Sequence, residues 1–373
     1  MKKNSPYKKS LIALIACGVL LTSALIGGIS AKYTQQVALS GTGADITLQQ
    51  VEKETDFALV ENTVTAEADG SYVKAEGITD EGVSYFLIPG TTLPKNPVVS
   101  VTNKTELPAY LYLVLAGPAS TTGEFEYAVD ANTWKALDGV ANTYVYAPGG
   151  TESEFKGGET KTAHILAEDK ISVTSLKKLA AKGDMTILCY LVQNMGKENA
   201  KDVWNDKSGL VDTTAMLTNK FTVGEVTAQI VESFDGTTKS SVQVKNTGNV
   251  PAVVRARLIV NWLDENGNVI ANPQGVTDPA LNNIDTTKWT KIGDYYYYNG
   301  YVAAGDQTAN LLKNSITAAG TPAGYQLQIE VVAEAMQATG QMPDGTPAAK
   351  AAWGHYYGKD TAGTLKWLPD DYR

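Results

Sequence analysis

Two stretches of the chain, Val99–Leu115 and Val242–Leu258, repeat one strand–turn–strand pattern. In each, alternating valines lead to an asparagine, a proline follows five residues later, and apolar residues then occupy every second position. The second copy continues this alternation to Trp262. A period of two is typical of a β-strand with one face in a core. Because such a face needs a second layer to cover it, the duplication indicates two β-domains in tandem.

Further pairs of segments recur in the same order in both halves. They are Asp130–Trp134 with Asp285–Trp289, a tyrosine-rich strand after each, Ile187–Gly196 with Gln328–Gly340, and the stretches that end at Trp204 and Trp353. The third pair sets Cys189 against Glu330. Since loops change length more readily than strands, the uneven spacing is expected. A repeat of this length predicts two copies of a domain rather than a solenoid.

Signals for β-strands dominate the rest of the chain. Its 34 glycines and 14 prolines separate short alternating runs rich in Val, Ile, Thr and Tyr. We therefore predict an all-β fold of two tandem antiparallel β-sandwich domains, jelly-roll or immunoglobulin-like, with few short helices. The predicted limits are residues 32–205 for domain one, 206–216 for a linker, 217–356 for domain two and 357–373 for a polar C-terminal tail with apolar anchors at Leu365 and Trp367.

The first 31 residues have the layout of a secretory signal peptide. Four lysines and no acid precede an apolar run, Leu11–Ile29, which ends in small residues. This layout predicts cleavage between Ala31 and Lys32. Two alternatives stay open. The apolar run is long enough to remain as an anchor helix, and the residues before Cys17 look like a lipobox, which would lead to lipidation of that cysteine.

The charge balance argues against a nucleic-acid partner. Removing the four lysines of the signal peptide would lower the net charge from −9 to −13, which leaves no basic excess for phosphates. Cys189 would be the one remaining cysteine, so no internal disulfide can form. We expect an exported protein, extracellular at the cell surface or in a matrix, that touches the membrane only through its signal peptide before cleavage.

The sequence contains no recognisable catalytic constellation. Its two histidines, His164 and His355, fall in different predicted domains, and HExxH, GxSxG and phosphate-loop motifs are absent. Cys189 lies within an apolar strand pattern, which is typical of a packing residue rather than a nucleophile. We therefore expect no enzymatic activity, no cofactor and no metal site.

The segment Asp264–Asn268 is the best candidate for a metal-binding loop. It places oxygen-bearing side chains at alternate positions, as calcium loops do, but Val269 and Gly275 replace the glycine and the glutamate that such loops use. Its Asn266–Gly267 pair is also a strong signal for a two-residue type I′ hairpin. We favour the hairpin and leave calcium as an alternative.

A run of tyrosines, Tyr295–Tyr298, predicts a strand with aromatic residues on both faces. The favoured interpretation is structural, in which the tyrosines pack in the core or pair across neighbouring strands. The alternative is a binding surface for a glycan or a protein, with Tyr296 and Tyr298 as the candidate outward residues. Arg255 and Arg257 are expected on the solvated face, paired with acids of a neighbouring strand.

The export junction GGISAKYTQQ and the segment KNTGNVPAVVRARLIVNWLDENGNV resemble secreted proteins of Gram-positive bacteria that the signal peptidase SipW processes, the TasA and camelysin family of biofilm matrix proteins. This chain departs from that pattern in carrying two such domains. The resemblance implies jelly-roll-like sandwiches, an extracellular matrix role, and association with itself or with other matrix proteins. Some camelysins are described as metallopeptidases, but no zinc motif here supports that activity.

The resemblance also implies polymerisation by donation of an N-terminal strand to the next subunit. The matching segment is Lys32–Ser40, in which Tyr33, Gln35, Val37 and Leu39 alternate on one face. It would extend a neighbouring sheet through backbone hydrogen bonds. The alternative is that this segment is the first strand of its own domain. We thus expect a non-enzymatic structural protein, with an extracellular adhesin as the alternative and an exported metallopeptidase as a weaker third.

Overall fold

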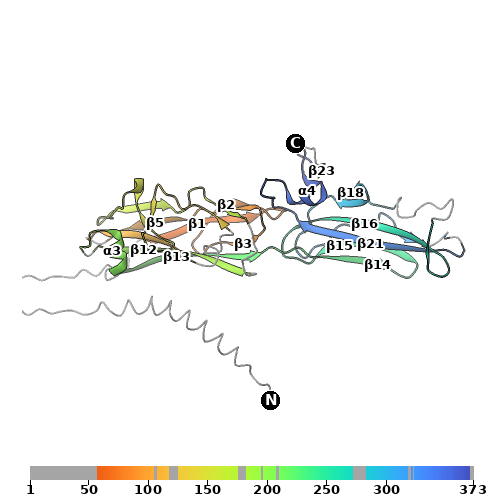
Figure 1. The fold of residues 1–373 in the computed structure, drawn as a ribbon, viewed down its shortest axis with the longest axis horizontal. Helices are drawn as coiled ribbons and strands as arrows, with labels where there is room; N and C mark the ends of the chain where they lie inside the picture. Colours follow the sequence, from red (N-terminus) through yellow and green to blue (C-terminus); the bar gives the residue numbers. More distant parts are fainter. Residues whose placement is uncertain are drawn as a thin grey trace, which may run out of the picture.

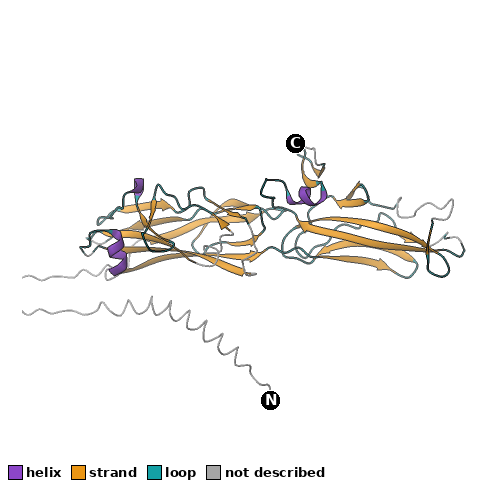
Figure 2. Ribbon diagram, viewed as in Figure 1, coloured by secondary structure: helices purple, strands orange, loops and turns teal. Residues whose placement is uncertain are grey.

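The computed structural model describes residues 57–104, 107–116, 125–174, 182–194, 196–206, 210–271, 283–317, 321 and 323–369. Two β-sandwiches lie end to end and give an elongated molecule (Figure 1), and the described chain is mostly strand and loop (Figure 2). The predicted all-β class is confirmed. The predicted signal peptide with Cys17, the cleavage site at Ala31 and Lys32, and the segment Lys32–Ser40 lie outside the described residues.

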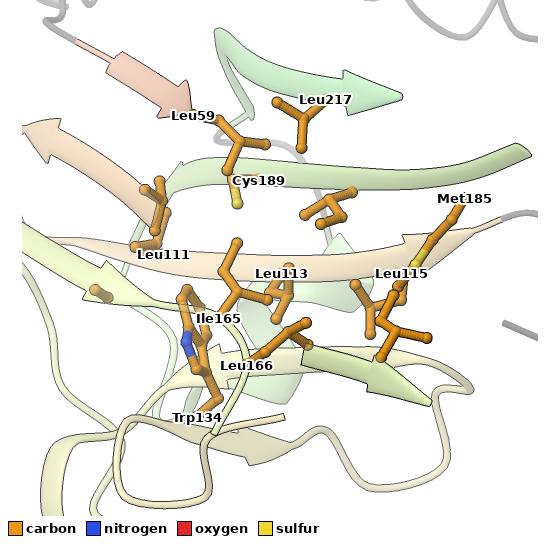
Figure 3. Close-up of a cluster of buried hydrophobic side chains, with 14 of the residues drawn as sticks. Leu59, Leu111, Leu113, Leu115, Trp134, Ile165, Leu166, Met185, Cys189 and Leu217 are labelled. Atoms are coloured by element: carbon orange, nitrogen blue, oxygen red, sulfur yellow. The ribbon is translucent and has the colours of Figure 1, made fainter. Parts of the chain in front are cut away.

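Domain one packs one large sheet against two smaller ones. The large sheet has the order β3-β13-β12-β6-β9-β8 and contains β3 (Ser84–Leu87), β6 (Ala109–Ala116), β8 (Trp134–Ala136), β9 (Thr143–Tyr146), β12 (Lys182–Gln193) and β13 (Leu210–Val223). The smaller sheets, β10-β5-β1-β2 and β4-β11-β7, contain β1 (Phe57–Ala66), β2 (Tyr72–Thr79), β4 (Thr91–Pro94), β5 (Val98–Thr102), β7 (Phe125–Glu126), β10 (Thr160–His164) and β11 (Lys170–Val173). A 3-10 turn, η1 (Pro148–Gly150), and the helix α3 (Ala200–Asp206) complete it. The predicted alternation on β6 fills the core, where Leu111, Leu113 and Leu115 belong to the same buried cluster as Cys189 of β12 (Figure 3).

Domain two repeats this plan with fewer strands. One sheet, of order β14-β15-β20, contains β14 (Ala228–Phe234), β15 (Thr238–Asn246) and β20 (Ile316–Thr317). The other contains β16 (Ala252–Leu263), β17 (Val269–Ile270), β18 (Trp289–Ile292), β19 (Tyr295–Tyr298) and β21 (Gln326–Gln337). The helix α4 (Ala348–Trp353) and a hairpin of β22 (Tyr356–Lys359) and β23 (Leu365–Leu368) follow. None of the helices in the described part of the chain has the length and hydropathy that a membrane crossing requires.

The two domains share a common order of four strands. In domain one, β6 lies between β12 and β9, and β8 follows β9; in domain two, β16 lies between β21 and β19, and β18 follows β19. The pairings also set the register between the copies. Cys189 lies opposite Leu113, and Ala333 lies opposite Ala256, which is the repeat partner of Leu113. Cys189 therefore corresponds to Ala333, and its predicted match with Glu330 is wrong by three residues.

A fully buried asparagine stabilises the same turn in both domains. Its Nδ2 donates to the carbonyl just before the following proline and to a carbonyl of a facing loop. The acceptors are the carbonyl oxygens of Leu107 (2.8 Å) and Phe155 (2.9 Å) for Asn103, and of Val250 (2.8 Å) and Val302 (3.0 Å) for Asn246. Because buried carbonyl groups need donors, this explains why an asparagine stands at that point of each repeat.

The predicted linker at residues 206–216 is wrong. Most of it belongs to β13, which runs antiparallel to β12 and parallel to β3 and so completes domain one. Leu217 and Phe221 of this strand are buried in the core of that domain. The polar composition before Met216 suggested a loop, but threonine and valine also favour strands, and pairing on both sides decides the outcome. The connection to domain two is Gly224–Thr227.

The predicted polar tail is also wrong, because β22 and β23 fold as a hairpin onto domain two. Trp367 is 6% exposed, and its Nε1 donates to the carbonyl of Tyr298 at 2.8 Å. Leu365, the other predicted anchor, is 44% exposed. The hairpin is held by Trp367, whose ring and N–H both have partners, together with Leu368, which is fully buried.

The two domains meet at a joint in which backbones approach closely. The N–H of Gly224 donates to the carbonyl of Leu87 at 2.7 Å. Gly90 has a φ of +75°, and a Cβ placed on it would lie 1.9 Å from the carbonyl oxygen of Gln341. From the other side, a Cβ on Gly340 would lie 2.7 Å from the carbonyl oxygen of Pro89. The joint therefore requires glycine on both sides.

Candidate functional site

The tyrosines predicted to face outward point into the core, so the predicted binding surface is wrong. Tyr296 is 7% exposed and belongs to the core of domain two. The ring of Tyr298 packs against Trp289 with the ring centroids 5.2 Å apart. Tyr296 lies opposite Ala256 of β16, which is buried in that core. Because paired residues of antiparallel strands share a face, this pairing turns Tyr296 inward. The observation that favoured an adhesin is thereby lost.

The opposite face of β19 is covered as well. Tyr297 is buried beneath α4 and the β22–β23 hairpin, where its ring lies 4.7 Å from that of Trp367 and 5.9 Å from that of Trp353. The guanidinium of Arg255 lies 4.0 Å from the ring centroid of Tyr295 and 4.8 Å from that of Trp353. This second aromatic layer explains how a tyrosine run can occupy both faces of one strand.

The predicted ion pair of Arg255 is present, although its side chain is 15% exposed rather than solvated. Its Nε and Nη2 both donate to Oε2 of Glu334, at 3.0 and 2.7 Å. The hydroxyl of Tyr295 donates to Oε1 of the same carboxylate at 2.8 Å. Desolvation tends to raise the pKa of Glu334, but hydrogen bonds from Tyr295 and Arg255 outweigh it and leave the pKa below its ordinary value. These contacts hold the second aromatic layer against β16 and β21.

Arg255→Lys should destabilise domain two by about 1–2 kcal/mol, because an ammonium has a single nitrogen and cannot donate from two nitrogens to Oε2 of Glu334 while lying flat on Tyr295. The measurement is urea unfolding followed by tryptophan fluorescence. Arg257→Lys is the matched control on the same strand, since its guanidinium lies farther from the Tyr295 ring, at 5.6 Å. Equal losses in both variants would contradict a specific role for Arg255.

In the candidate calcium loop, donors of the loop itself make hydrogen bonds to the carboxylate of Asp264. Asp264 Oδ1 accepts the backbone N–H groups of Asn266 and Asn268 at 2.8 Å each, and its Oδ2 accepts the Asn268 amide at 3.0 Å. These bonds, led by the Asn268 side chain, lower the pKa of Asp264. The predicted hairpin is confirmed, because Leu263 of β16 lies opposite Val269 of β17. Its predicted two-residue type I′ turn is wrong, since Gly267 has a φ of 80° but Asn266 has no positive φ, and the loop spans Asp264–Asn268.

Side chains that could jointly hold a metal ion stay apart in the described ranges. No group of three or more His, Cys, Asp and Glu residues is placed there to hold a metal ion. The thiol of Cys189 is fully buried, and desolvation raises its pKa far above the ordinary value. A thiol in that state packs rather than reacts.

The feature that distinguishes domain two is an unpaired strand edge. In domain one, β12 pairs with β6 on one side and with β13 on the other. Its counterpart β21 pairs with β16 along Gln326–Gln337, and no described strand pairs with its other edge. The described part of domain two thus contains no equivalent of β13. A long edge with free N–H and C=O groups is a template for another strand.

The apolar face beside this edge is incompletely covered. Five inward side chains of β21 pack on the core of domain two, yet none is fully buried: Leu327, Ile329, Val331, Ala333 and Ala335. The corresponding positions of β12 are buried, namely Met185, Ile187, Cys189 and Leu191. Across the sandwich, Ile230 of β14 lies opposite the buried Val244 and is 37% exposed. We call the unpaired edge of β21 with Leu327, Ile329, Val331 and Ile230 the open edge.

Comparisons with known proteins identify no family. No family model matches the chain, and no curated protein matches it. Among solved structures, a chaperone–tip adhesin complex of CFA/I fimbriae is 9% identical, with 67% of this chain and 95% of that chain covered and a TM-score of 0.20. The class 5 fimbriae chaperone CfaA is 13% identical, with 67% and 96% covered and a TM-score of 0.18. The major pilin SpaD of Corynebacterium diphtheriae is 10% identical, with 84% and 61% covered and a TM-score of 0.22. TM-scores this low carry no information about function.

The open edge was not predicted from the sequence. After α3, the chain of domain one forms β13, which pairs with β12. After α4, the chain instead forms the β22–β23 hairpin, which packs on the second aromatic layer. A signal was present in the repeat itself, because the strand that follows Trp204 has no matching apolar alternation after Trp353. The predicted donor residues Tyr33, Gln35, Val37 and Leu39 lie outside the described residues.

Proposed function

We propose that this chain is a secreted, non-enzymatic subunit of a surface or matrix assembly, and that its subunits join by strand donation. The open edge of domain two carries the proposal. It offers an unpaired strand of twelve residues beside half-covered apolar side chains, at the place where domain one has β13. A strand supplied by another chain would pair with β21 and cover Leu327, Ile329 and Val331.

The proposed occupant is Lys32–Ser40 of a second copy. Three of the four alternate residues on one face of this segment are apolar, namely Tyr33, Val37 and Leu39, and the fourth is Gln35, so an added strand could bury most of that face. Val37 and Leu39 would supply part of the cover that Leu217 and Phe221 of β13 give to domain one. The resemblance to the TasA and camelysin family supports the same segment, together with export, cleavage after Ala31 and an extracellular location.

The layout of the molecule favours donation between copies. The turn between β1 and β2 approaches domain two, where a Cβ on Gly70 would lie 3.0 Å from Pro251. β1 therefore begins, at Phe57, at the end of domain one that is remote from domain two (Figure 1). In a row of copies, the N-terminal side of one copy would face the open edge of another. Such head-to-tail contacts generate open-ended assemblies.

Size-exclusion chromatography with light scattering tests the proposal on chains that begin at Lys32 and at Gly41. The longer chain should form large species as its concentration rises, and the shorter chain should stay monomeric. A peptide of residues 32–40 should bind the shorter chain, and a peptide with Val37→Lys and Leu39→Lys should not. Monomers of equal stability in both chains would refute strand donation. Unfolding of the shorter chain would also refute it, because the segment would then be a strand of its own domain.

A further inference from the structure

Three polar side chains lie buried together in the core of domain one. Glu61 is on β1, Lys95 follows β4, and Asn219 is on β13, and each is at most 2% exposed. Each continues the inward alternation of its segment, two residues after a buried leucine, namely Leu59, Leu93 and Leu217. The topology thus brings three polar groups to one apolar site from positions far apart in the sequence.

The contacts link the three groups in a row. Lys95 Nζ touches Oε2 of Glu61, and both side chains are completely enclosed. The backbone N–H of Val83 donates to Oδ1 of Asn219 at 3.1 Å and also interacts with the Glu61 carboxylate. The N–H of Val83 therefore brings the Asn219 carboxamide and the Glu61 carboxyl group to one donor, and Lys95 contacts that carboxyl group.

Two atoms of this site have no hydrogen-bond partner, Oε1 of Glu61 and Nδ2 of Asn219. A buried polar atom without a partner destabilises the fold, and a buried ion pair is itself costly. The three side chains are shielded from bulk water, since the side chains of Glu61 and Lys95 are 0% exposed and Asn219 is 0% exposed. A site that is costly to maintain and has an unpaired amide nitrogen is better explained by chemistry than by packing.

Burial also sets the protonation states. Desolvation raises the pKa of Glu61, although contacts with Lys95 oppose that rise. Desolvation likewise lowers the pKa of Lys95 to about 8, despite the nearby Glu61. Burial therefore enlarges the fraction of neutral amine, which is the nucleophilic form of lysine.

We infer that Lys95 and Asn219 form an intramolecular isopeptide bond, with Glu61 as the proton carrier. The Nζ lone pair attacks Cγ of Asn219, and the N–H of Val83 stabilises the negative charge that develops on Oδ1. Glu61 accepts one proton from Nζ and delivers a proton to Nδ2. The carbonyl re-forms, the Cγ–Nδ2 bond breaks and ammonia leaves. The products are one amide and one ammonia, and no oxidant or reductant is needed.

The assignment to Asn219 rests on its contacts. Its oxygen is held by a donor, which polarises the carbonyl, and its nitrogen is unpaired and so can leave without breaking a hydrogen bond. The new bond would join the segment after β4 to the last strand of domain one. This inference concerns the interior of domain one and does not depend on strand donation.

The intact mass of the purified chain that begins at Lys32 is the test. The expected mass is lower than the sequence mass by one ammonia, and a protease digest should contain a branched peptide that joins Lys95 to Asn219. Lys95→Met, Glu61→Gln and Asn219→Ala should each give the full sequence mass. Asn219→Asp should lose one water instead. Lys239→Met is the matched control, because Lys239 is a buried lysine of domain two that bonds to Glu232 at 2.6 Å, and this variant should keep the ammonia loss.

Two results would overturn the inference, and both come from the unmodified sequence, so neither depends on whether a variant folds. A wild-type chain at its full sequence mass would show that no bond forms. A wild-type chain that has lost one water, with Lys95 joined to Glu61 in the digest, would assign the carboxyl group as the reacting partner and remove Asn219 from the reaction.

Discussion

Asn246→Ala should lower the free energy of unfolding of domain two by about 2–6 kcal/mol, because two buried carbonyl groups lose a donor that no water can replace. The Nδ2 of Asn246 donates to Val250 at 2.8 Å and to Val302 at 3.0 Å. Its Oδ1 also accepts the N–H of Gly248 at 3.0 Å. Since whole domains are stable by only about 5–15 kcal/mol, the loss is large.

Urea unfolding measures this effect on the full mature chain, with each domain followed through its own tryptophans. Trp289 reports on domain two and Trp134 on domain one, so a variant that keeps either residue as the sole core tryptophan separates the two transitions. Asn103→Ala should shift the transition of domain one by a similar amount. Asn266→Ala, in an exposed loop, is the control, and an Asn246 variant as stable as this control would contradict the role given to the turn.

Gly90→Ala should open the joint between the domains while leaving each domain folded. The added Cβ would lie 1.9 Å from the carbonyl oxygen of Gln341, and both atoms belong to backbone, so no side-chain rotation can relieve the overlap. The φ of +75° adds about 1–2 kcal/mol of strain for any residue with a Cβ. Small-angle X-ray scattering should show a broader distribution of shapes, and proteases should cut faster within Gly224–Thr227.

Gly149→Ala separates steric overlap from backbone strain. Gly149 also has a positive φ, of +68°, but nothing lies within 4 Å of a Cβ placed on it. This variant should lose stability in domain one and keep the wild-type scattering curve. Identical scattering from the Gly90 and Gly149 variants would show that the contact with Gln341 does not fix the arrangement of the domains.

The repeated alternation was sufficient to predict the strands that build each core. β6 and β16 lie where the pattern placed them, because a period of two has one structural explanation in a half-buried strand. When both faces of a strand carry similar residues, the pattern does not show which face points into the core. Tyr296 and Tyr298 were therefore assigned to the wrong face, which only pairing with β16 could decide.

The two sites proposed above depend on long-range pairing, and for that reason sequence patterns did not predict them. The open edge is the lack of a partner for β21 among the described strands, and a strand's own residues do not specify its neighbours. Glu61, Lys95 and Asn219 are far apart in the chain and match no local motif. A buried lysine could have been suspected from the apolar alternation around it, but its partners could not.

β13 gives the molecule a particular response to mechanical load. It is the last strand of domain one, and four residues, Gly224–Thr227, separate it from β14. It lies between β12 and β3, and its pairing with β12 extends from Leu210 to Thr222. Tension that pulls the domains apart acts along this strand, so its hydrogen bonds are sheared together instead of being peeled off one at a time. The strand that connects the domains is thus also one that resists extraction through many hydrogen bonds at once.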